Sequence, residues 1–142
     1  MKNNLICAVL ATSFLMVFTQ SVEAGAFSVA FKWGKIPYCN DGFPGSVSNP
    51  IFTLSNVPTG TKKIGFEMED LDYSSVQGGG AVAYTEQKVI EPGAFKYESP
   101  CPPGRARTYE WTALAIDASG NIIGKASARK KYPAWRIPEP AN

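Results

Sequence analysis

The chain has 142 residues, 44% of them hydrophobic, and a formal net charge of +2 at pH 7. So small a charge, with no run of basic residues interleaved with aromatic ones, argues against a nucleic-acid-binding protein. The chain contains no histidine, which excludes Ser–His–Asp and Cys–His nucleophile pairs and removes the commonest metal ligand.

Residues 1–24 have the layout of a secretory signal peptide. Lys2 supplies a positive start, residues 5–18 are mostly apolar, and Val22-Glu23-Ala24 provides a cleavage site of the usual kind. The alternative is a retained membrane anchor, but the apolar run is shorter than the about 20 residues that span a bilayer. We expect cleavage after Ala24, a periplasmic or secreted chain of about 118 residues without a transmembrane segment, and a single domain.

The body of the chain, residues 25–131, places apolar residues at alternate positions, a pattern typical of β-strands. We expect strands at residues 27–33, 51–54, 62–70, 81–90, 107–117 and 121–128. Gly- and Pro-rich turns separate them, and DASGN at 117–121 suits a hairpin connection. The fold class is therefore all-β, a sandwich or barrel with little helix. The Pro-rich residues 132–142 are expected to form a C-terminal tail.

Two further segments have no expected chemistry. The triplet Gly78–Gly80 lacks the strand and helix that flank a phosphate-binding loop, so it predicts a flexible connection. The basic cluster Arg129–Lys131 predicts a solvated end of the domain.

Cysteine usage supports export. Loss of Cys7 with the leader leaves Cys39 and Cys101, which can form one intramolecular disulfide. Closing a loop of this length stabilises a fold by about 4 kcal/mol in the chain-entropy model. The alternative is two buried free thiols. Two sulfurs without a histidine are a poor start on a four-ligand zinc shell, so we expect no metal and no cofactor.

Asp70 and Asp72, in MEDLDYSS, are the candidate acidic pair, because alternate residues at a strand end project to the same side. The same DxD pattern is also typical of turn carboxylates that accept hydrogen bonds from local backbone N–H groups. With no histidine and no further support for this pair, we expect the protein not to be an enzyme.

Two motifs resemble the phosphatidylethanolamine-binding protein (PEBP) family, in particular its small bacterial branch. SNPIFTLSNVPTGTKKIGFEMEDLDYSS is similar to the family block SP-x-L-x-W-x-x-VP-x-GTK that leads through an apolar strand to DPDAP. SPCPPGRARTYEWTALAID is similar to the block GPCPP-x-G-x-HRY-x-F-x-x-YALD, and YCNDG falls where bacterial members often carry CDG. The resemblance covers most of residues 38–117. It implies an antiparallel β-sandwich with a small anion-binding pocket at one end.

The family's pocket residues carry over only in part. Its two pocket aspartates match Asp70 and Asp72, although the proline between them is Leu71 here. Its second pocket histidine matches Arg107, and the tyrosine that follows matches Tyr109. Arginine stays charged at every physiological pH and presents a planar fork of donors suited to carboxylate or phosphate.

The remaining matches concern the edges of the pocket. Pro100, Pro102 and Pro103 match its stiff loop. The first pocket histidine is expected at Gly80 and the neighbouring tryptophan at Ala81, so both functions are absent. The resemblance therefore implies a degenerate pocket.

Two states of that pocket follow. Arg107 pairs bidentately with Asp70 or Asp72 and closes it, or the carboxylates hold Arg107 in position for an anion. An open site favours binding of a small anionic or phosphate-bearing ligand by Asp70, Asp72, Pro102, Arg107 and Tyr109. The degenerate pocket and the Pro- and Trp-rich residues 132–142 favour instead a protein-interaction module, such as an inhibitor of an exported enzyme or a subunit of a surface assembly, with an exported protein as partner.

Overall fold

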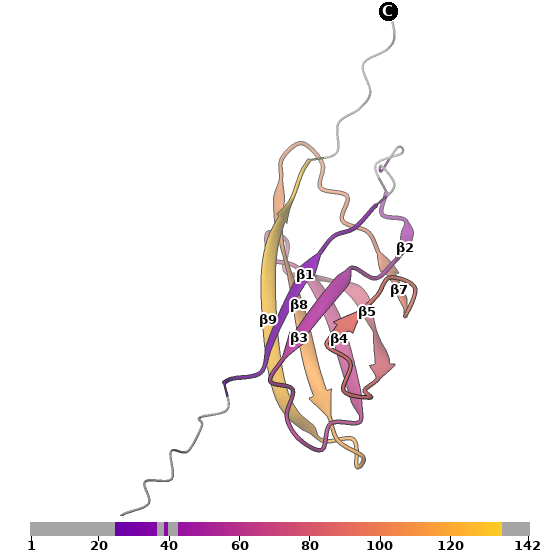
Figure 1. Ribbon diagram of the computed structural model, residues 1–142. Coiled ribbons are helices and arrows are strands. Elements are labelled where there is room, and N and C mark those ends of the chain that lie inside the picture. Colours follow the sequence, from indigo (N-terminus) through magenta and orange to yellow (C-terminus); the bar gives the residue numbers. More distant parts are fainter. Residues whose placement is uncertain (1–24, 37–38, 40–42, 135–142) are drawn as a thin grey trace, which may run out of the picture.

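The computed structural model describes residues 25–36, 39 and 43–134, and this part of the chain contains nine strands and no helix (Figure 1). The expected signal peptide and residues 135–142 of the expected tail lie outside the described residues. In chain order the strands are β1 (Ser28–Lys32), β2 (Ser46–Ser48), β3 (Ile51–Ser55), β4 (Lys63–Asp70), β5 (Ser75–Ala83), β6 (Val89–Ile90), β7 (Lys96–Glu98), β8 (Arg107–Ile116) and β9 (Ile122–Tyr132).

The strands form three sheets, and every pairing is antiparallel. The largest has the order β5-β4-β8-β9, the second β1-β3-β6, and β2 pairs with β7. In Figure 1 the β1–β3 layer lies across the four-stranded sheet. The described chain is thus all-β, and the prediction of an antiparallel sandwich is confirmed.

The core lies between these layers because apolar residues alternate along each strand. On β8, Tyr109, Trp111, Ala113 and Ala115 are buried in one row. The ring of Phe52 on β3 stacks on Phe66 at 4.2 Å between centroids and meets Trp111 edge-on at 5.1 Å. Burial of such side chains contributes about 1.5–3 kcal/mol each and fixes the registers of β4 and β8.

The prediction of a flexible Gly78–Gly80 connection is wrong, because all three glycines lie within β5. Gly78 has φ +98° where the β4–β5 register shifts between Glu67 and Glu69, which marks a bulge. A Cβ at Gly79 would collide with the carbonyl oxygen of Phe66. The triplet thus allows two backbones to approach closely, and the strand expected at 81–90 instead divides between β5 and β6.

Two other expectations concern the β8–β9 hairpin. Asp117–Asn121 connects its strands as predicted: Asp117 Oδ1 accepts hydrogen bonds from the backbone N–H groups of Ser119 and Asn121, and Gly120 has φ +87°. The prediction that residues 129–131 form a solvated domain end is incomplete, because they are exposed but belong to β9. Arg129 Nε donates to Glu110 Oε2 across the hairpin at 2.5 Å.

Candidate functional site

Asp70 and Arg107 meet at one end of the four-stranded sheet. Asp70 is the last residue of β4 and Arg107 the first of β8, and the antiparallel register pairs Asp70 with Tyr109. Arg107 Nη1 donates to Asp70 Oδ2 at 3.0 Å, with the two side chains 13% and 2% exposed. The bond is charge-assisted and largely removed from water, which makes it stronger than a surface ion pair.

Asp72 does not bind Arg107. Its Oδ2 accepts a hydrogen bond from the backbone N–H of Thr108 at 2.7 Å, and its own N–H donates to Asp70 Oδ1 at 3.0 Å. Its other oxygen lies 3.7 Å from Nη2 of the exposed Arg105, a pair that contributes little in water. The two carboxylates therefore have different roles, because Asp70 holds the cation while Asp72 holds the turn and the start of β8.

Two tyrosines complete the surroundings of Arg107. The Tyr73 ring lies 3.8 Å from the guanidinium carbon and is 65% exposed, so it covers the cation from the solvent side. Tyr109 is buried and hydrogen-bonded to Asp70; burial above all, then the charge and hydrogen bond of Asp70, raise the pKa of its phenol. Sequence reasoning identified Tyr109 but missed Tyr73, whose one signal was its position directly after the acidic pair.

The guanidinium of Arg107 is a permanent cation, and its contact with Asp70 uses only one of its nitrogens. Burial lowers the pKa of Arg107, but the hydrogen bond and charge of Asp70, with Tyr73 and Tyr109, more than offset this and raise it. The contact with Asp70 is made by Nη1 alone, so the expected bidentate closure is not formed. Arg107 Nε is buried and has no hydrogen-bond partner within the described part of the chain.

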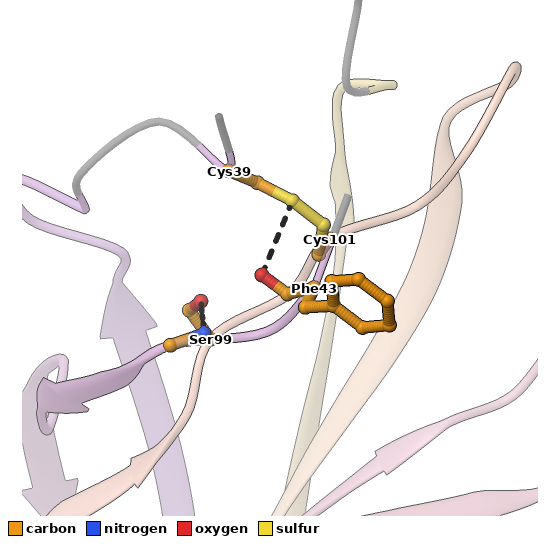
Figure 2. The surroundings of a disulfide bond; sticks show 5 residues. Cys39, Phe43, Ser99 and Cys101 are labelled. Carbon is orange, nitrogen blue, oxygen red and sulfur yellow. Dashed lines mark hydrogen bonds between the residues drawn. A yellow bond between two sulfur atoms is a disulfide. The ribbon is translucent and has the colours of Figure 1, made fainter. Parts of the chain in front are cut away.

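A disulfide and buried prolines fix the loop that leads to Arg107. Cys39 and Cys101, 62 positions apart, are joined with their Cα atoms 5.9 Å apart (Figure 2). The Cys39 sulfur lies 3.6 Å from the Phe43 carbonyl oxygen, and the Gly45 N–H donates to Ser99 Oγ at 3.0 Å. Pro100 and Pro102 are fully buried on either side of Cys101. Pro102 thus supports the loop.

Comparison with known proteins gives structural likenesses only. No family model matches the chain, and no curated protein matches it. The crystal structure of YbcL from E. coli, described as a new member of the mammalian PEBP family, matches with a TM-score of 0.53 at 16% identity, over 77% of this chain and 99% of that chain. The chain has a PEBP-like fold. A putative PEBP homolog from Chlamydia trachomatis, CT736, matches with a TM-score of 0.47 at 21% identity, over 75% of this chain and 97% of that one.

Within this PEBP-like fold, Ser75 rather than Gly80 lies beside Asp70. The β4–β5 register pairs Asp70 with Ser75, whose Oγ accepts a hydrogen bond from Gln77 Nε2 at 3.1 Å. Gly80 pairs with Phe66, and a Cβ there would meet the Phe95 ring. Gly80, the position expected for the first pocket histidine, therefore pairs four residues before Asp70 on β4.

Aromatic residues line the opposite side of Arg107 in this PEBP-like sandwich. Arg107 pairs across the sheet with Tyr132, whose ring lies 5.3 Å from that of Trp33. Trp33 also meets Tyr109 edge-on at 5.9 Å, and its Nε1 donates to the Lys131 carbonyl at 3.3 Å. This contact ties the end of β1 to the end of β9 beside the Asp70–Arg107 pair. Sequence reasoning placed Trp33 on the core face of its strand but not at the site.

Metal-binding clusters and membrane-spanning helices are absent from the described residues. Within residues 25–36, 39 and 43–134, no group of three or more Cys, Asp or Glu side chains is placed to hold a metal ion. None of the described residues belongs to a helix long and apolar enough to span a membrane.

Proposed function

We propose that the protein is an exported, non-catalytic binding protein whose PEBP-like fold holds a small oxyanion at Arg107. One observation carries this proposal: Arg107 is fixed by a single hydrogen bond from Nη1 to Asp70. A guanidinium has five N–H donors, so most of its capacity to bind an anion is left. Phosphate and carboxylate oxygens are the acceptors that best match its planar fork.

The charges around Arg107 are consistent with an anionic ligand. Arg105 and Arg107 provide two cations beside Asp72 and Asp70, and Asp72 is already engaged by the Thr108 N–H. A further cation, the exposed Lys130 on β9, has its Nζ 5.5 Å from the centre of the Phe31 ring. Asp70 offsets one charge but also holds the guanidinium in one orientation, which lowers the entropy lost on binding.

The lack of catalysis and the export are parts of the same proposal. Both carboxylates of the acidic pair already accept hydrogen bonds, and Asp70 is ion-paired, so neither is placed as a free general base. The leader-like residues 1–24 and a disulfide that persists in oxidising compartments support a periplasmic or secreted location.

Titration of the purified, oxidised protein with inorganic phosphate and phosphoethanolamine tests the function. We expect chemical-shift changes in ¹H–¹⁵N spectra centred on residues 105–109, and weaker binding by Arg107→Lys, which keeps the charge but loses the fork. Binding that is absent, or equal in the variant, would contradict the proposal. Turnover of a phosphate ester that disappears in Asp70→Asn would contradict the non-catalytic role.

A second candidate, a protein-interaction module, is favoured by the surface next to the site. Tyr73 and Val76 are 65% and 61% exposed at the turn that enters β5. β5 is an edge strand without a charged residue over Ser75–Ala83, an arrangement that can accept an added strand. Cross-linking in an exported fraction tests it: a partner captured by the wild type should be lost from Val76→Lys. Equal capture by both proteins would count against this role.

A further inference from the structure

The four-stranded sheet β5-β4-β8-β9 has one face that no strand of the described chain covers. Rings from β3 and β7 pack edge-on against Trp111 in the inward row of β8, and Trp33, directly after β1, meets Tyr109 in the same row. Figure 1 shows the β1–β3 layer on that side of the sheet. The outward side chains therefore meet no other described strand, and such a face of an antiparallel sheet is ordinarily polar.

Half of this outward face is apolar instead. Cross-strand pairing carries the outward positions from Gly65 on β4 to the neighbouring strands. The apolar side chains at these positions are Ala81, Ala83, Leu114, Ile116 and Ile122. Both alanines are exposed, Ile122 is 60% exposed, and Lys63 and Lys125 lie at the borders of the apolar half. Exposed apolar residues that gather on one face in this way mark an interaction site.

The two sides of the face differ in height. β4 and β5 present glycine and alanine outward in the apolar half, whereas β8 and β9 present leucine and isoleucine. A Cβ on Gly65 would lie 3.5 Å from Ile116 Cδ1 and 3.8 Å from Leu114 Cβ, so the large side chains directly border the low side. A two-fold axis parallel to the strands, between β4 and β8, lays the low side of one copy on the raised side of the other. The apolar surface is thus complementary to a second copy of itself.

The charges on the same face are complementary in the same way. Glu67 and Glu69 point outward from β4, and Lys125 and Lys131 point outward from β9. None of these four side chains makes an ion pair within the described part of the chain, whereas Glu110 on β8 is already ion-paired with β9. The two-fold arrangement places the acidic side of each copy over the basic side of the other, so the attraction is made twice. Charges matched across an interface fix the orientation of the partners.

We propose that the outward face of the four-stranded sheet is the interface of a two-fold dimer of this chain. Sheets that pack face to face lie about 10 Å apart, which leaves room for Leu114 of one copy above Gly65 of its partner. The apolar half then forms the core of the interface and the charged residues form its rim, as in stable interfaces. The inference goes beyond the oxyanion function, because Arg107 belongs to the inward row of β8 and lies outside this interface.

Sedimentation velocity of the purified, oxidised protein tests the dimer. From about 10 to 100 μM we expect the wild type to sediment with twice the mass of one chain. Ala81→Arg puts a long cation on the low side of the face, where the second copy would bury it, and should sediment as a single chain. The matched control is Ala30→Arg, which makes the same change at an exposed position of β1 on the other sheet and should stay dimeric. Circular dichroism and the unfolding temperature check that both variants are folded.

Charge reversal tests how the two copies are oriented. Glu67→Lys/Glu69→Lys and Lys125→Glu/Lys131→Glu each set like charges against one another in their own dimers, whereas a mixture of the two variants restores opposite charges at both contacts. At low salt we expect the dimer dissociation constant of each variant alone to rise roughly tenfold. The equimolar mixture should form dimers as the wild type does.

Three results would overturn the inference. The first is a wild type that sediments as a single chain up to about 100 μM, whether the face is then free or covered by residues 135–142. The second is an Ala81→Arg variant as dimeric as Ala30→Arg, because the dimer then forms through another surface. The third concerns the charge variants: if they stay dimeric alone, or dissociate and do not recover on mixing, the two-fold arrangement is wrong.

Discussion

The carboxylate of Asp72 accepts a hydrogen bond from the backbone N–H of Thr108 at 2.7 Å, directly beside Arg107, for which it was one of two candidate partners. The acidic pair thus positions Arg107 in two ways. Asp70 binds the side chain of Arg107, and Asp72 binds the backbone of the next residue on β8. Substitutions of Asp70 and of Asp72 should therefore differ in how much stability they remove and in which contact they break.

Asp70→Asn should destabilise the fold by about 3 kcal/mol, because it leaves the buried Arg107 charge without its counter-charge. Urea unfolding followed by tryptophan fluorescence measures this loss. Asp70→Asn combined with Arg107→Met should recover much of it, since the double variant has no unpaired buried charge. A loss below about 0.5 kcal/mol in the single variant would show that the ion pair does not stabilise the fold.

Asp72→Ala should cost about 1–2 kcal/mol, because the Thr108 N–H loses its acceptor at a turn. Arg105→Ala removes the exposed partner of the same carboxylate and should change stability by less than about 0.5 kcal/mol. The two variants compared in the same urea series decide which contact of Asp72 matters. Equal losses would contradict the assignment of Asp72 to the backbone.

Cys39→Ser and Cys101→Ser should each lower stability by about 4 kcal/mol in the chain-entropy model, because the cross-link closes a loop of 62 positions. Reduction of the wild-type protein should give a similar loss, and the reductant should not affect either variant. Thermal unfolding with and without dithiothreitol measures both. Unchanged stability after reduction would mean that the disulfide does not constrain the unfolded chain.

Gly79→Ala should destabilise by more than about 2 kcal/mol, because the new methyl group collides with the carbonyl oxygen of Phe66. Gly45→Ala is the matched control, since a Cβ there meets nothing within 4 Å. It should change stability by less than about 0.5 kcal/mol. Similar unfolding midpoints for the two variants would contradict the close approach of β4 and β5.

The hairpin between β8 and β9 should respond to acid through Asp117. Hydrogen bonds from the Asn121 side chain and backbone, and from Ser119 and Gly120, lower the pKa of Asp117 below its ordinary value of 3.8. A depressed pKa means that its contribution to stability is complete above about pH 3.8 and is lost as the pH falls through the lower, folded value. Carboxyl ¹³C titration measures this, and Asn121→Ala should move the midpoint upward.

Alternating apolar residues predicted most strands, because a strand that buries one face must repeat every two residues. The row Tyr109, Trp111, Ala113 and Ala115 predicted which face of β8 is buried. The short strands β2 and β7 were not predicted, because three residues carry too little periodicity to separate from a loop. Gly78–Gly80 was misread because local composition does not reveal that another backbone lies against it.

The sequence predicted the charged residues of the site, which lie at two strand ends, but it did not predict most of the aromatic side chains around them. Asp70 and Arg107 could be placed together because a family motif put each at the end of a strand. Tyr73 and Trp33 reach Arg107 and its cross-strand neighbour Tyr132 through turn geometry and sheet packing, which single-sequence patterns do not encode. The β4–β5 register pairs Ser75 with Asp70 and Gly80 with Phe66, and motif spacing alone did not predict this register.

The two ends of β1 have different neighbours, Asn56 before the strand and Tyr132 after it. Its start lies near Asn56, whose Nδ2 donates to the Ala26 carbonyl, and its end leads to Trp33 beside Tyr132. A protein tethered through the segment before β1 would therefore present the Arg107 pole outward. Immobilisation on a sensor surface by an amino-terminal tag should leave this pole accessible to dissolved ions, whereas attachment after β9 would crowd it.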